Sequence, residues 1–198
     1  MALGLNPRFA FVSVTAIGFA IAYFYQRGQI DSYYRQDRWM VVHEHAEQAE
    51  PDVTLILGDS LVERQRIVDM CGPALNAGVI GSTTLDLLPH VAPLIALSKP
   101  KQIVINLGVN DKRTAVPLLE FVARFGGILD QTKAIPTLVV GIFSGGPYDD
   151  ALRGLVEKRQ GRYTPYPVDA RYTIDGLHLS ADGAGVWRTA VRKALCGA

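Results

Sequence analysis

The stretch Val53-Thr-Leu-Ile-Leu-Gly-Asp-Ser-Leu61 decides the fold. Its first part, Val53-Leu57, is a continuous apolar run of strand length, which is typical of a strand buried on both faces of a parallel sheet. Gly58-Asp59-Ser60 follow at once, and a helix is predicted from Leu61 to Met70. The stretch therefore predicts a strand and a helix with a serine at their junction.

The same alternation continues along the chain. Further strands are predicted at Ile103-Leu107 and Leu138-Ile142, with weaker candidates at Leu75-Asn76 and Pro167-Val168. Further helices are predicted at Thr83-Ser98 (with a break near Pro89 and Pro93), Ala115-Ala134 and Ala181-Leu195. Alternating strands and helices predict an α/β fold with a central parallel sheet covered by helices on both sides. In such folds a ligand binds beyond the carboxyl ends of the strands.

Composition and charge narrow the class of protein. The chain has 198 residues, and its 20 Lys and Arg against 19 Asp and Glu give a net charge of +1. No dense basic stripe interleaved with aromatic residues is present, so nucleic acid is not an expected partner. The composition divides the chain into an N-terminal membrane anchor or signal segment (1-28), a juxtamembrane helix or stalk (29-50) and one globular domain (51-198).

An uncharged apolar run extends from Phe9 to Tyr25, at the lower limit for a helix that spans a bilayer. A cleaved signal peptide is the alternative, because Ala20-Ile21-Ala22 has the form of a cleavage site. The bulky aromatic residues directly after this site favour an uncleaved transmembrane helix and hence the membrane as a partner. More arginines follow the run than precede it, and this charge pattern alone would leave the domain inside the cell.

Two smaller features, a pair of histidines and a pair of cysteines, do not by themselves indicate a functional site. His43-Glu44-His45 could suggest a metal, but histidines two positions apart do not share a helix face, so a solvated helix is the better interpretation. Cys71 and Cys196 could form a disulfide in an oxidising compartment or remain as two free buried thiols.

Four short motifs fall at the carboxyl ends of the predicted strands or before the last helix. Ser60 could be a plain helix N-cap, and the segments around Gly78 and Asn110 could be ordinary turns. Asp175 and His178, three residues apart around Gly176, have the spacing that lets a carboxylate orient an imidazole toward a serine. Four such motifs in order at one edge of a sheet are not easily explained as separate turns.

This set resembles the SGNH (GDSL-type) hydrolase superfamily, whose four blocks supply Ser, Gly, Asn and His. The resemblance extends from about Val53 to the C-terminus. It implies a three-layer, flavodoxin-like fold and hydrolysis of an ester without metal or cofactor. It also implies a periplasmic or otherwise extracytoplasmic catalytic domain, anchored by a single pass or secreted after signal cleavage. Small departures are Leu61-Val62-Glu63 after the serine and the sequence Gly78-Val79-Ile80-Gly81 in the second block.

Carried over residue by residue, the resemblance makes Ser60 the nucleophile, His178 the general base and Asp175 the residue that orients it. The oxyanion hole would consist of the Ser60 and Gly78 backbone N–H groups and the Asn110 side chain. Asp59 and Asp111 would support the loops without a chemical role.

The substrate is less constrained than the chemistry. The longest irregular stretch, Ser144 to Tyr166, is expected to line the cleft, and its tyrosines suit a polar ester such as an O-acetylated saccharide. A short acyl chain on a lipid is also compatible with a membrane anchor. The same triad could pass its acyl group to a sugar hydroxyl as an O-acyltransferase, and an inactive binding module of the same fold is the remaining alternative. No Walker-type loop or G-x-G-x-x-G follows the first strand, which argues against a nucleotide-binding flavodoxin relative.

Overall fold

The computed structural model describes the backbone of residues 7–197, and the side chains of residues 17–197 except that of Ile21. Its internal contacts divide the chain between Arg38 and Trp39, and the second unit, Trp39–Ala198, is compact. Helix α1 (Pro7–Glu47) extends through this division, so its last turns are part of the compact unit.

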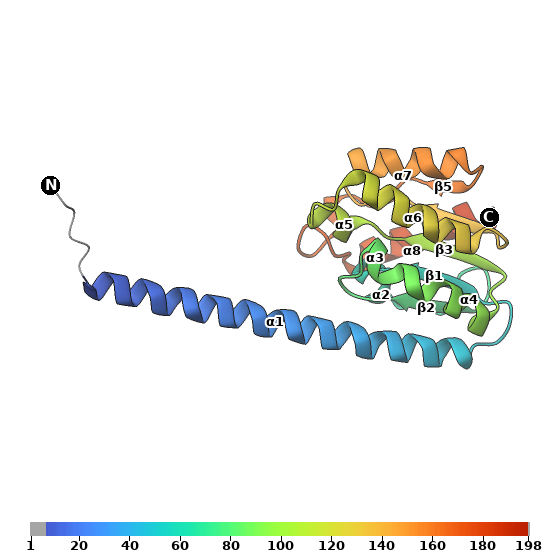
Figure 1. The fold of residues 1–198 in the computed structure, drawn as a ribbon. Helices are drawn as coiled ribbons and strands as arrows, with labels where there is room; N and C mark the ends of the chain where they lie inside the picture. Colours follow the sequence, from blue (N-terminus) through green and yellow to red (C-terminus); the bar gives the residue numbers. More distant parts are fainter. Residues whose placement is uncertain (1–6, 198) are drawn as a thin grey trace. The chain divides into compact units, whose positions relative to one another are not determined.

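The centre of the compact unit is a sheet of five parallel strands in the order β2-β1-β3-β4-β5. Figure 1 labels β2, β1, β3 and β5 of this sheet. The strands are β1 (Thr54–Gly58), β2 (Ala74–Gly78), β3 (Gln102–Asn106), β4 (Thr137–Val140) and β5 (Arg162–Thr164). Gly58 at the end of β1 is in register with Gly78 and Asn106. The loops that follow these three strands therefore begin at one edge of the sheet, beside the point where the strand order reverses.

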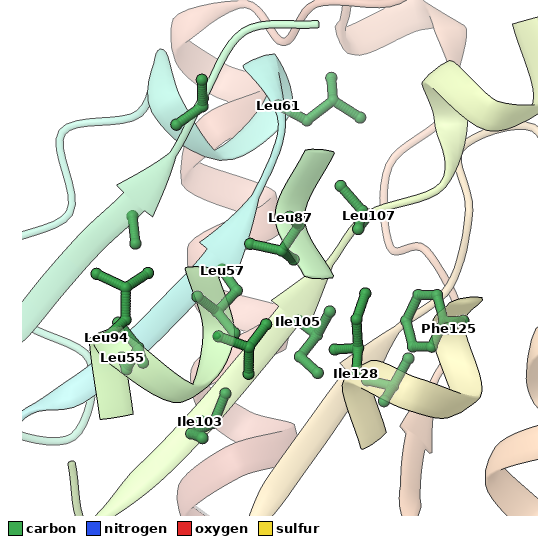
Figure 2. Packing of buried hydrophobic residues seen from close by; sticks show 14 of the residues in the cluster. Leu55, Leu57, Leu61, Leu87, Leu94, Ile103, Ile105, Leu107, Phe125 and Ile128 are labelled. Atoms are coloured by element: carbon green, nitrogen blue, oxygen red, sulfur yellow. The ribbon is translucent and has the colours of Figure 1, made fainter. Parts of the chain in front are cut away.

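Successive residues of the strands pack into two separate cores, because strand side chains alternate between faces. On one face, Leu55, Leu57 and Ile105 pack against helices α3 (Thr84–Leu87), α4 (Val91–Ser98) and α6 (Leu118–Thr132), as Figure 2 shows for Leu87, Leu94, Phe125 and Ile128. On the other face, Ile56 and Val104 pack against Trp187 and Val191 of α8 (Ala181–Cys196). The predicted three-layer α/β architecture is confirmed.

The helix predicted after Ser60 is wrong beyond its first turn. Helix α2 spans only Ser60–Glu63, and the chain then turns away. The Asn76 side chain donates to the carbonyls of Val62 and Gln65, each at 2.9 Å, so strand β2 satisfies backbone groups that a longer helix would have bonded internally.

The predicted break in Thr83-Ser98 is confirmed. A 3-10 helix, η1 (Leu88–His90), separates α3 from α4 and contains Pro89. Two other features differ from the prediction. A short helix that was not predicted, α5 (Val109–Arg113), follows β3, and the helix predicted from Ala115 begins only after Pro117, as α6.

The stretch Ser144 to Tyr166 was predicted to be irregular, and this prediction is wrong. It contains α7 (Pro147–Lys158) and β5, while Pro167-Val168 forms no strand. Pro147 suits the first turn of a helix, and the acidic Asp149 and Asp150 lie in that turn. One face of the helix is buried through its apolar side chains Leu152, Leu155 and Val156. The glycine and proline content that suggested a loop marks only the start of this helix.

The end of α1 is packed, not solvated. Trp39, Val42 and Ala46 are buried in the core of the compact unit. His43 Nε2 lies 3.0 Å from Nδ1 of His90, whose ring stacks on Trp39 with centroids 3.9 Å apart. The solvated interpretation of His43-Glu44-His45 is therefore wrong for His43, and the compact unit includes residues that composition assigned to the stalk.

The structure gives no support to the predicted transmembrane helix. Much of the apolar run Phe9 to Tyr25 lies outside the residues whose side chains are described. Among the residues that are described, no helix has the length and apolar character that a membrane crossing requires.

The two cysteines, whose state the sequence left open, form a disulfide. Cys71, before β2, is bonded to Cys196 at the end of α8, with their Cα atoms 6.2 Å apart. The C-terminal helix is thereby joined covalently to the loop between α2 and β2.

Candidate active site

Ser60 lies in a tightly built turn between β1 and α2. A Cβ atom at Gly58 would overlap the Val62 side chain and the Asn106 carbonyl oxygen, so only glycine fits at the end of the strand. Asp59 caps the helix, since its Oδ1 accepts a 2.9 Å hydrogen bond from the Leu61 N–H. Ser60 itself is the first residue of the helix and is only 4% exposed.

His178 is held by a short loop that precedes α8. Asp175 Oδ1 accepts hydrogen bonds from the backbone N–H groups of Leu177 (3.1 Å) and His178 (2.7 Å), while Oδ2 lies 2.6 Å from His178 Nδ1. The backbone of Gly176 has φ 83°, a conformation that glycine adopts without strain. The bond from His178 lowers the pKa of Asp175 to about 2, so this carboxylate stays ionised in neutral solution.

The loop brings the imidazole to the serine. His178 Nε2 lies 3.1 Å from Ser60 Oγ, although the two residues are 118 positions apart. Ser60, His178 and Asp175 thus form a continuous hydrogen-bonded chain. Such a chain can take a proton from the hydroxyl as it attacks and can stabilise the resulting imidazolium.

Gly78 has a different environment from the one expected of an oxyanion donor. Its backbone N–H donates a 2.9 Å hydrogen bond to Oδ1 of Asn76. A Cβ atom at this position would overlap the backbone of Glu63. The structure therefore accounts for this glycine by close packing of β2 against α2, and its N–H already has an acceptor.

Asn110 lies in α5 and Gly81 in the turn after β2, and a hydrogen bond joins these two segments. Asn110 Nδ2 donates to the Ser82 carbonyl at 3.0 Å, which uses one of its two hydrogens and ties α5 to the turn after β2. Gly81 in that turn has φ 78°, and no hydrogen bond of its N–H is found among the described residues. The donor expected from the sequence was the Gly78 N–H, although Gly78-Val79-Ile80-Gly81 also offers this second glycine.

Two buried carboxyl groups support these loops. Asp111 accepts hydrogen bonds from the backbone N–H and hydroxyl of Thr84, which joins α5 to α3, and burial raises its pKa. Asp59 is fully buried, and its Oδ2 is among the buried polar atoms for which the described structure gives no partner. Burial raises the pKa of Asp59 to about 7, and the nearby Asp111 adds to this rise.

A cleft of about 300 Å³ opens beside the imidazole. It is lined by Val109, Lys112, Arg113, Phe143, Ser144, Asp175, Gly176, Leu177 and His178. A second hollow of about 290 Å³ shares Phe143 and Ser144 with it and extends to Tyr166. In the described part of the chain, no three side chains of the kinds that bind metals lie together.

Known structures resemble this chain at low sequence identity. No family model and no curated protein matches the sequence. A Streptococcus pneumonia structure described in connection with platelet activating factor aligns with 90% of this chain and 98% of its own, at 19% identity and a TM-score of 0.74.

Two further structures extend the comparison. A GDSL-like lipase from Bacteroides thetaiotaomicron aligns with 79% of this chain and 98% of its own, at 15% identity and a TM-score of 0.63. A catalytic mutant of Axe2, an acetylxylan esterase from Geobacillus stearothermophilus, aligns with 74% of this chain and 95% of its own, at 16% identity and a TM-score of 0.59. Together with the parallel sheet and its strand order, these likenesses establish that the chain has the SGNH (GDSL-type) hydrolase fold.

Proposed function

We propose that the protein is a serine hydrolase that cleaves an acyl ester with Ser60, His178 and Asp175. The observation that carries the proposal is the hydrogen-bonded chain from Ser60 Oγ through the His178 imidazole to the Asp175 carboxylate. Its members come from two loops distant in sequence, which separate turn or capping roles would not bring together.

In this mechanism, His178 accepts the proton of Ser60 as the hydroxyl attacks the acyl carbonyl. The alcohol leaves with a proton returned by His178, and an acyl-serine remains. Water then attacks this ester by the same route and releases the acid. Asp175 keeps Nδ1 protonated and stabilises the imidazolium in both steps.

The oxyanion would be held between the loops that follow β1, β2 and β3. Two donors are available there. Among the described residues, no acceptor is found for the Ser60 N–H, and Asn110 uses only one of its two amide hydrogens, on the Ser82 carbonyl. For the third donor we favour the Gly81 N–H over that of Gly78, because the Gly78 N–H already donates to Asn76. Donors that are fixed before the reaction stabilise the developing charge without reorganisation.

A small polar ester fits the cleft, and an O-acetylated saccharide is the substrate class we favour. The cleft of about 300 Å³ is at the lower end of ligand-site volumes, and both charged and aromatic side chains line it. The acetylxylan esterase among the structural neighbours acts on an ester of this kind.

The direct test is labelling with a fluorophosphonate, which reacts with activated serines. The wild type should be labelled at Ser60 and Ser60→Ala should not, whereas Ser144→Ala, which removes another serine of the cleft, should still be labelled at Ser60. Labelling of Ser60→Ala at a similar rate would exclude Ser60 as the nucleophile. With acetylated saccharides, release of free acetate supports a hydrolase, and a new ester on a second sugar would show a transferase.

We also propose that the chain is attached to a membrane through its N-terminal apolar run and acts outside the cytoplasm. The support for attachment is the uncharged sequence from Phe9 to Tyr25. The disulfide between Cys71 and Cys196 supports an oxidising compartment, since such bonds persist mainly outside the cytosol.

A further inference from the structure

Two cations from α5 line the cleft beside His178. Helix α5 begins directly after Gly108 at the end of the β3 loop, so it lies at the edge of the sheet that carries the triad. Its last residues, Lys112 and Arg113, both line the cleft together with Asp175 and His178. The proposed ester hydrolysis gives neither cation a task.

Lys112 is already bonded within the protein. Its Nζ donates to the Gly145 carbonyl at 2.9 Å and to the Phe143 carbonyl at 3.5 Å. These bonds brace a loop in which Ser144, Gly145 and Gly146 all have positive φ. The ammonium group thus serves to hold one wall of the cleft in place.

Arg113, in contrast, is exposed, and no hydrogen bond or ion pair of its guanidinium is found among the described residues. Its charge nevertheless reaches the serine turn, because it counteracts the rise in the pKa of Asp59, the residue before Ser60. A guanidinium here presents several donors toward the space in which a bound ester would lie.

The acidic groups around this cleft do not neutralise Arg113. Asp175 faces its own loop and His178, from which it receives three hydrogen bonds. Asp111 is buried and bonded to Thr84, and Asp59 is buried beneath the serine turn. An unpaired cation therefore remains at the mouth of the site.

We propose that the natural substrate carries an anionic group, a carboxylate or a phosphate, within a few atoms of the scissile ester, and that Arg113 binds this group. The inference rests on the proposed esterase function and specifies its substrate class. Charge-assisted hydrogen bonds from a guanidinium to such an anion would orient the ester over Ser60.

The test uses pairs of esters that differ in one anionic group. Mono-4-nitrophenyl adipate with 4-nitrophenyl hexanoate tests a carboxylate on the acyl side. 3-Acetoxybenzoate with phenyl acetate tests a carboxylate on the alcohol side, and 1-acetylglycerol 3-phosphate with 1-acetylglycerol tests a phosphate there. The quantity compared is the ratio of kcat/KM within each pair, which cancels general effects on activity.

In at least one pair, Arg113→Gln should lower the ratio of anionic to neutral ester by about tenfold, the order expected for one charge-assisted hydrogen bond. Arg113→Glu should lower it further. Lys158→Gln is the control, because it removes the same charge from the exposed end of α7, away from the cleft, and should leave the ratio unchanged. Added salt should lower the wild-type ratio by screening.

An unchanged ratio in all three pairs for Arg113→Gln, with fluorophosphonate labelling of Ser60 intact, would overturn the anionic substrate class alone. An equal drop for both members of every pair would also overturn it, since it would indicate a structural role for Arg113. Absence of both labelling and ester hydrolysis in the wild type would overturn the proposed function, and this inference with it.

Discussion

The backbone N–H of Gly78 donates a 2.9 Å hydrogen bond to the side-chain oxygen of Asn76, two residues earlier in the same strand. The Asn76 amide in turn donates to the Val62 and Gln65 carbonyls, so one side chain joins β2 to the segment that follows the serine turn. Gly78 is thereby part of the scaffold beneath the site.

Gly78→Ala should lower the free energy of unfolding by about 1–3 kcal/mol, because the added Cβ overlaps the Glu63 backbone and forces β2 away from α2. Gly185→Ala is the control: the space around its Cβ is open and it lies inside α8, so it should stabilise the protein by about 0.5–1 kcal/mol. Urea unfolding of both variants checks the comparison. Equal stability of the two would contradict the packing role of Gly78.

Asn110→Ala should lower kcat by about 10²–10³ with little change in KM, because an oxyanion donor acts mainly on the transition state. Asn110→Asp should be at least as harmful, since it places negative charge where negative charge develops and opposes the Ser82 carbonyl that Asn110 now contacts. Steady-state kinetics on one ester measures both. Near wild-type kcat in Asn110→Asp would show that Asn110 serves only the turn.

Asp59→Asn should stabilise the protein, and more so at pH 8 than at pH 5. Burial raises the folded-state pKa of Asp59 from 3.8 to about 7, so the stability that its protonation contributes is fully present below pH 4 and is lost progressively as the pH rises through 7. The interval corresponds to a cost of roughly 4 kcal/mol at alkaline pH, as an upper estimate. Denaturant unfolding of both proteins across this range provides the measurement. A difference between them that does not grow with pH would show that Asp59 folds with an ordinary pKa.

The full-length chain should remain with membranes through a carbonate wash, and removal of residues 1–28 should release it. A truncation to residues 51–198 should release it too but unfold at lower denaturant concentration, because it also removes Trp39, Val42 and Ala46 from the core. Recovery of full-length protein in the wash supernatant would refute membrane attachment. Equal stability of the two truncated forms would contradict the core role of α1.

Much of the fold could be predicted because strands buried on both faces have a simple pattern. The run Val53-Leu57 and the two runs like it leave a central parallel sheet as the natural arrangement. Helix α7 was missed because Gly145, Gly146 and Pro147 suggest a loop, although a proline and two acidic residues also suit the first turn of a helix.

Part of the candidate site could likewise be predicted from the sequence, and part could not. Asp175 and His178 are close in sequence, so their hydrogen bond follows from local spacing. The 3.1 Å approach of His178 to Ser60 could be expected only from the rule that parallel strands present their loops at one edge. Which glycine has a free N–H could not be predicted, because it depends on where the Asn76 side chain points.

The disulfide between Cys71 and Cys196 closes the chain from β2 to the end of α8 into a covalent ring. Any single cut inside this ring, for example at the exposed Gln160 between α7 and β5, leaves two polypeptides that remain one molecule. Asn110 and His178 lie within the ring, and Ser60 is attached to it through Cys71. A nicked chain would therefore migrate as one molecule without reductant and as two fragments with it, while every residue of the proposed triad stays linked.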